Sequence, residues 1–187
     1  MSSDLSDAEL VKQIQAGKEE AMSQLYRRHR PSLFRYALSK TYNQQLAEDI
    51  VGEIFLRMVQ YLPTYQITGA PFTAWLFRIA HNTLITIAKK ESRYLTVPLE
   101  DVNPPSNRDD GPDKQVEIQL SKEHIWQGLL HLDESQRDVV ILRFLVGLSL
   151  KETAHALEKS VGAVKTLQHR GIQSLRIALN SKRSKIA

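Results

Sequence analysis

The chain has 187 residues, a net charge of +4 and a hydrophobic fraction of 42%, enough for one large or two small globular domains. It has no cysteine, which excludes disulfides and thiolate metal sites and fits a reducing cytoplasm. No apolar run approaches the roughly 20 residues of a membrane span, and the first ten residues lack the features of a signal peptide. We therefore expect a soluble, cytoplasmic protein without membrane insertion.

The N-terminal part has helical periodicity. Ser6 and Glu9 have the spacing of a capping box, which predicts the start of a first helix. Gly17 interrupts the pattern, and a second helix is expected to resume after it and to extend to Arg30. A third helix, at about 44–61, completes this run.

The helix predicted at 44–61 has two unlike faces. One arc is apolar, and the other carries acids around a single leucine: Glu48, Asp49, Gly52, Glu53 and Leu56. An apolar side chain among carboxylates is suited to docking a basic partner helix. Singly exposed leucines are also ordinary, so both interpretations stay open at this point.

Aromatic and basic residues alternate in the next segment. The stretch 63–71 is bounded by prolines and is predicted to be irregular, and a fourth helix is expected at about 72–92. The alternating residues are Tyr65, Phe72, Trp75, Phe77, Arg78, His81, Asn82 and Lys89. Such a mixture is used to stack unpaired bases and to follow a phosphate backbone, but the aromatics are equally suited to a core.

Residues 94–115 form a different kind of segment. They contain four of the seven prolines, and residues 94–120 carry a net charge of −4 between flanks of +3 and +5. Little in the segment is suited to a core, so we expect an extended acidic linker between two helical domains. The two basic flanks are compatible with polyanionic partners.

The C-terminal part is also predicted to be helical. A first helix is expected at 114–130, and a second starts at an Asp133 cap and stops at Gly147. Ser149 and Glu152 form another capping box, which opens a short helix to residue 157, and Ser160 caps a last helix that extends to about 179.

The two last helices have the spacing of a helix-turn-helix. On the second of them, Val164 and Leu167 face the first helix, and the opposite face carries cations, a hydroxyl and amides but no acid. Such a face can enter a DNA major groove, where cations bind phosphates and Thr166 or Gln173 reaches base edges. The alternative is a solvated face of a helical bundle.

Signatures of catalysis are lacking in the sequence. It has no phosphate-binding glycine loop, no His-Glu-x-x-His motif and no nucleophile elbow, and its six histidines lack ligand spacing. We expect neither an enzyme nor a bound metal or cofactor.

Four stretches in order resemble the extracytoplasmic-function (ECF) sigma factors, the smallest branch of the sigma-70 family of bacterial RNA polymerase. Residues 8–37, AEDIVGEIFLRM (47–58) and FTAWLFRIAHN (72–82) are similar to sigma domain 2, and residues 132–170 to sigma domain 4. The resemblance implies an all-α fold with a four-helix sigma domain 2 at 1–93, a flexible linker at 94–115, and sigma domain 4 with a helix-turn-helix at 116–187.

The resemblance also implies a role for each site. In the family the acidic helix binds the clamp helices of the polymerase β′ subunit, which points to Asp49, Glu53, Ile54 and Leu56. The irregular loop and the next helix hold a flipped-out base of the non-template strand of the −10 element, which points to Tyr65, Gln66, Trp75, Arg78 and Asn82. The last helix reads the −35 element as duplex, which points to Lys165, Thr166, His169 and Arg170.

The partners implied by the resemblance are core RNA polymerase, through the β′ clamp helices and the β flap, promoter DNA, and an anti-sigma factor. Several positions depart from the family pattern. Gly52 stands where a glutamine is usual, Glu158 stands where the turn usually has glycine, and Lys159 stands at a usually apolar position. The pair Leu167-Gln168 replaces a frequent Arg-Leu pair, which removes one cation.

Two other classes remain as alternatives. A stand-alone helix-turn-helix regulator would bind duplex DNA without polymerase and would need an effector or dimerisation domain at 1–93. A small helical enzyme would need a polar pocket, which the sequence does not indicate.

Overall fold

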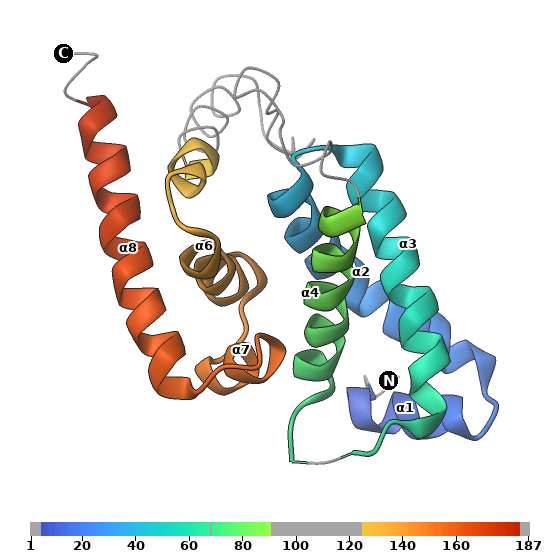
Figure 1. Cartoon of the computed structure of the whole chain (residues 1–187). Helices are drawn as coiled ribbons and strands as arrows, with labels where there is room; N and C mark the ends of the chain where they lie inside the picture. The colour runs from blue at the N-terminus through green and yellow to red at the C-terminus, as the bar shows by residue number, and fades with distance from the viewer. Residues whose placement is uncertain (1–4, 68, 91–124, 184–187) are drawn as a thin grey trace, which may run out of the picture.

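The computed structural model describes residues 5–67, 69–90 and 125–183, and all regular structure in these ranges is helical. The helices form two groups that lie side by side, with α1 to α4 in one and α6 to α8 in the other (Figure 1). The prediction of an all-α protein with two helical domains is confirmed. The predicted linker at 94–115 and most of the helix predicted at 114–130 lie outside the described residues, and residues 125–130 are helical.

The first group follows the predicted order. Its elements are α1 (Asp7–Gln15), α2 (Glu19–Thr41), α3 (Gln44–Tyr61), the short 3₁₀ helix η1 (Leu62–Thr64) and α4 (Phe72–Lys90). The capping box is present, since the Ser6 hydroxyl accepts from the Glu9 amide and the Glu9 carboxylate accepts from the Ser6 amide. Asn43 caps α3 in a similar way by accepting from the amide of Leu46 at 2.9 Å.

The prediction that the second helix ends at Arg30 is wrong, because α2 continues through Pro31 to Thr41. A proline inside a helix removes the hydrogen bond to the carbonyl four residues earlier, here that of Arg27. Both residues are exposed, so water can satisfy this carbonyl. The buried side chains of Leu33 and Tyr36 on the other face keep the helix continuous.

An ion cluster attaches α1 to α2. Arg28 donates to one carboxylate oxygen of Asp7 at 2.7 Å, and the buried His29 shares a hydrogen bond of 2.9 Å with the other. Burial alone would raise the pKa of Asp7, but the hydrogen bonds from His29 and Arg28 outweigh it and hold the pKa below its usual range. The ionised carboxylate therefore stabilises the folded state.

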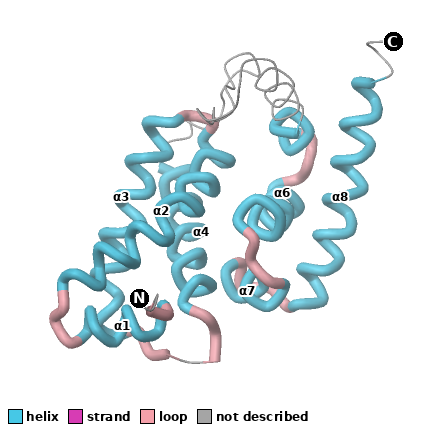
Figure 2. Tube along the Cα trace, turned by 180° about the vertical axis from the view of Figure 1, so that it is seen from behind, coloured by secondary structure: helices cyan, strands magenta, loops and turns pink. Residues whose placement is uncertain are grey.

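The second group contains α6 (Glu134–Val140), the π-helical turn η3 (Ile141–Val146), α7 (Leu150–Ala156) and α8 (Val161–Arg183). The predicted Asp133 cap is confirmed. The helical run ends at Gly147, whose φ of 91° lies in the left-handed region that glycine adopts without strain. The π-helical turn itself was not predicted. Seen from behind, α8 is the outermost helix of this group (Figure 2).

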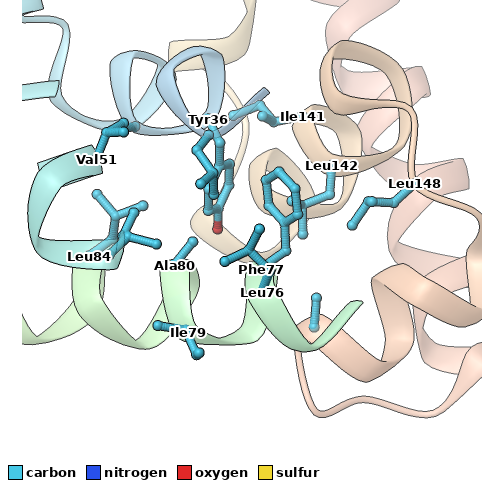
Figure 3. Packing of buried hydrophobic residues seen from close by; sticks show 14 of the residues in the cluster. Tyr36, Val51, Leu76, Phe77, Ile79, Ala80, Leu84, Ile141, Leu142 and Leu148 are labelled. Atoms are coloured by element: carbon cyan, nitrogen blue, oxygen red, sulfur yellow. The ribbon is translucent and has the colours of Figure 1, made fainter. Parts of the chain in front are cut away.

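One continuous apolar core joins the two groups, which the sequence could not indicate. In Figure 3, Phe77 of the first group lies beside Leu142 of the second, and Tyr36 lies next to Phe77 with its hydroxyl directed toward α4. Helix α2 packs on η3, and α4 packs on α7. Polar contacts also cross this interface, since Lys40 donates to the buried Asp138 at 2.7 Å.

Candidate functional site

Helices α7 and α8 form the predicted helix-turn-helix. The Ser149 hydroxyl accepts from the Glu152 amide and the Ser160 hydroxyl accepts from the Ala163 amide, so each predicted cap is present. Val164 of α8 is completely buried, and Ala154 of α7 is 5% exposed. The small side chain of Ala154 fits the expected helix crossing.

The turn between these helices contains an unusual residue. The amide of Lys159 donates to the carbonyl of Ala154 at 2.9 Å and that of Glu158 to His155 at 3.3 Å, which is the Schellman pattern of a helix end. Glu158 has a φ of 53°, in the left-handed region that glycine adopts without strain. The missing turn glycine has therefore left the turn geometry intact, at a cost in backbone strain.

The candidate DNA-reading residues lie together on the exposed side of α8. Lys165, Thr166, His169 and Arg170 are all exposed. The Thr166 hydroxyl donates to the carbonyl of Gly162 at 3.1 Å, which leaves its oxygen able to accept. Because α8 is the outermost helix of its group, this face is accessible to a DNA duplex (Figure 2).

A close contact at Gly171 holds α8 against α6. Gly171 is buried, and a methyl group at this position would lie 2.8 Å from Cγ2 of Val140 and 3.4 Å from the carbonyl of Gln136. The absence of a side chain lets α8 approach α6 closely. The orientation of the exposed face therefore depends on this glycine.

Aromatic side chains of the first group line a hollow of about 440 Å³. The rings of Tyr65 and Trp75 have centroids 4.4 Å apart, and Phe72 contacts both at 5.8 and 5.5 Å. The lining residues are Tyr61, Thr64, Tyr65, Gln66, Ala70, Trp75, Arg78 and His155. The hollow thus combines stackable rings with a cation, which suits an unpaired nucleotide.

The structure brings together four of the five residues predicted for this site: Tyr65, Gln66, Trp75 and Arg78. Asn82 is exposed on α4, one turn beyond Arg78, and does not line the hollow. Burial raises the pKa of Tyr65, with a smaller contribution from the charge of Asp7, so its ring stays neutral.

The sequence analysis missed Tyr61, Thr64 and His155 of the lining, and also Gln15, which supports the hollow without lining it. Gln15 of α1 donates from its amide to the carbonyls of Leu62 and Tyr65, both at 2.9 Å, and so holds the irregular loop in place. His155 of α7 reaches the hollow from the other helical group. No sequence signal could identify it, since it lies some 80 residues from the other lining residues.

The acidic face of α3 is accessible over most of its length. Leu56 is 63% exposed, Asp49 is exposed, and Glu53 accepts from Arg57 at 2.7 Å. Ile54 is completely buried in the core, so it lies beneath this surface rather than on it. A further apolar side chain that was not predicted for this surface, Val59, lies one turn after Leu56 and is 46% exposed.

No helix within residues 5–67, 69–90 and 125–183 is long and apolar enough to cross a membrane. In the same ranges no three histidine or acidic side chains gather in a way that could hold a metal ion.

Comparison with known proteins identifies both helical groups. The family model "Sigma-70 region 2" matches residues 25–94, and "Sigma-70, region 4" matches residues 128–176. The first match contains α3, α4 and every lining residue of the hollow except His155, and the second contains α7 and most of α8.

Individual relatives are sigma factors. The chain is 35% identical to the ECF RNA polymerase sigma factor BldN of Streptomyces coelicolor, over 89% of this chain and 63% of that protein. It is 32% identical to the ECF RNA polymerase sigma factor SigD of Mycobacterium tuberculosis, over 89% of this chain and 81% of the relative. The solved structure of CnrH in complex with the cytosolic domain of CnrY superposes with a TM-score of 0.71 at 26% identity, covering 94% of this chain and 97% of CnrH.

The order of the two matched regions, the identities above 30% and the helix-turn-helix with its acid-free outer face agree with one another. The chain belongs to the ECF sigma factors of bacterial RNA polymerase.

Proposed function

We propose that this protein is a promoter-specificity subunit in which α8 reads the −35 element as duplex and the aromatic hollow holds a flipped base of the −10 element. Sigma domain 2 then corresponds to residues 1–93, the linker to 94–115 and sigma domain 4 to 116–187. The observation that carries the proposal is the presence, on one chain, of an acid-free exposed helix face and a separate aromatic hollow beside Arg78.

Duplex reading is divided among the four exposed residues of α8. Lys165 and Arg170 bind phosphates and position the helix, while Thr166 and His169 reach base edges. A helix with its N-terminal turns toward the groove presents these side chains within two turns. The rigid packing at Gly171 sets the angle at which they meet the DNA.

Strand capture uses the stacking rings. Flipping a base out of a duplex costs a few kcal/mol, and stacking on an aromatic ring offsets about 1–3 kcal/mol of this. Tyr65 and Trp75 supply the rings, Arg78 supplies charge to a backbone phosphate, and Gln66 supplies an amide for a base edge. Asn82 contacts the strand beyond the hollow.

Polymerase docks on the exposed acidic face of α3. Asp49 and Glu53 pair with cations of the β′ clamp helices, and Leu56 inserts between them, while Ile54 supports this surface from the core. Domain 4 contacts the β flap. The chain itself catalyses no reaction, and it acts in the cytoplasm, where polymerase and promoters are. An anti-sigma factor holds it inactive. The complex of CnrH with the cytosolic domain of CnrY supports this regulation.

Run-off transcription tests the proposal. Sigma-free core polymerase is incubated with fragmented genomic DNA of the host, with and without the protein, and the transcript starts are mapped. Starts that appear only with the protein, each preceded by one shared pair of elements, are the expected result. Binding to duplex DNA without any new start would instead favour a stand-alone helix-turn-helix regulator.

A further inference from the structure

We infer that the protein closes on itself, with α7 and the Glu158 turn of domain 4 covering the hollow for the −10 strand, so that closure and strand capture exclude each other. This inference rests on the proposed function of the hollow. It adds that the competing occupant is a segment of the same chain.

Three residues of domain 4 reach the strand site. Glu158 forms an ion pair with Arg78, and Glu152 accepts a hydrogen bond of 2.7 Å from the hydroxyl of Thr73. His155, between them on α7, lines the hollow itself. A strand that followed α4 through the hollow would meet all three side chains.

The two acids act as substitutes for the DNA backbone. A carboxylate and a phosphate bind a guanidinium through the same charge-assisted hydrogen bonds. Arg78 pairs with Glu158 through Nη2, so a phosphate of the strand would compete with this carboxylate for the guanidinium. Burial raises the pKa of Glu152, but hydrogen bonds from Ser149 and Thr73 outweigh this and lower the pKa, so the carboxylate stays charged at neutral pH.

Backbone strain at Glu158 supports a function for this side chain. The turn needs a left-handed residue, and glycine would adopt that conformation without cost. A strained residue that persists in a turn indicates that its side chain is used. In the described part of the chain, the interaction made by the Glu158 side chain is the ion pair with Arg78.

The duplex-reading face is left open in the same arrangement. Lys165, Thr166, His169 and Arg170 are exposed on α8, while α7 lies against α4. Closure therefore blocks one element and not the other. The likeness to CnrH extends over 94% of the chain and thus over both domains, with a TM-score of 0.71, so CnrH has a comparable arrangement in its complex with the cytosolic domain of CnrY.

The packing of domain 4 over the hollow, and the exclusion of the strand by it, can be tested in the full-length protein. Because the chain has no cysteine, Gln24→Cys on α2 and Ile177→Cys on α8 accept a pair of fluorescent dyes for energy transfer between the domains. Strand binding is measured by fluorescence anisotropy with a single-stranded oligonucleotide that carries the −10 sequence found by transcript mapping. Duplex binding is measured with a −35 probe.

Glu158→Gly is the informative variant, since it removes the carboxylate and relieves the turn. We expect lower energy transfer and about two- to fivefold tighter strand binding, the range of a partly exposed ion pair, with −35 binding unchanged. Glu158→Gln keeps the backbone strain and is expected to tighten strand binding as well. Glu20→Gln, which removes a carboxylate from the first turn of α2, is the control and should change neither readout.

A closed form can also be locked. Thr73→Cys combined with Glu152→Cys, joined by a short reducible thiol crosslinker, should lose strand binding at least tenfold, keep duplex binding, and recover on reduction. Each single cysteine variant treated with the same reagent is the control. Strand binding that survives the crosslink, or energy transfer and strand affinity unchanged in Glu158→Gly, overturns the inference while leaving the transcription result, and with it the proposed function, untouched.

Discussion

The same substitution at two glycines should have opposite effects on stability. Gly52 in α3 and Gly171 in α8 both lie inside long helices, where alanine is favoured over glycine by about 1 kcal/mol. A methyl group at Gly52 would have no neighbouring atom within 4 Å, so Gly52→Ala should realise this gain. For a chain of this size the melting temperature should rise by about 2–4 °C.

At Gly171 the added methyl would lie 2.8 Å from Cγ2 of Val140, closer than real contacts allow. Valine in a helix has one strongly preferred rotamer, so Val140 cannot turn aside without strain. Overpacking a well-filled core costs about 1–3 kcal/mol, which meets or exceeds the helical gain. Gly171→Ala should therefore be neutral to destabilising by about 2 kcal/mol, and it should weaken −35 binding by displacing α8.

Urea unfolding followed by circular dichroism measures both changes on the full chain, and anisotropy measures the −35 affinity. Gly162→Ala serves as a second reference on α8, because its methyl would lie 3.9 Å from the nearest atom. A rise in stability of equal size at Gly52 and Gly171 would refute the packing argument.

Four further outcomes are expected. Lys165→Ala or Arg170→Ala should weaken −35 binding and reduce the salt slope by about one; an unchanged slope would mean that these residues touch no phosphate. Asn82→Ala should impair open-complex formation, followed by permanganate footprinting, with duplex binding nearly intact, and normal opening would remove that assignment. Leu56→Asp should weaken assembly with core polymerase in gel filtration, whereas Ile177→Asp should not. The ionised Asp7 stabilises the fold above about pH 4, and this contribution is lost as the pH falls through its lowered pKa. Asp7→Asn should therefore reduce the free energy of unfolding at pH 7 and make it depend less on pH in the acid range.

Local signals in the sequence were sufficient for the capped helix starts and for the stop at Gly147. The capping boxes at Ser6 and Ser149, the Asp133 cap and the stop at Gly147 depend on residues within one turn of each other, so their spacing alone predicts them. The end of α2 was not predictable in this way. Packing of Leu33 and Tyr36 on the rest of the core overrides the local effect of Pro31.

The candidate sites also differ in whether they depend on one element or on several. The exposed face of α8 follows from helical periodicity within a single element, and it was predicted residue by residue. The aromatic hollow combines a loop with residues of α3, α4 and α7, so sequence reasoning found Tyr65, Gln66, Trp75 and Arg78 but missed the contribution of His155 and the support from Gln15. Ile54 was assigned to the polymerase-binding surface by the resemblance and is buried, because it lies on the apolar arc of α3 that packs into the core.

The sequence by itself determined the helices, the two helical domains and the chemistry of each face, because these depend on periodicity and on neighbours along the chain. Only the tertiary structure decided that the domains pack together, that Glu158 reaches Arg78, and that Gly171 fixes the recognition helix. These contacts join residues far apart in sequence, and their geometry depends on the shape of the whole core rather than on any local pattern.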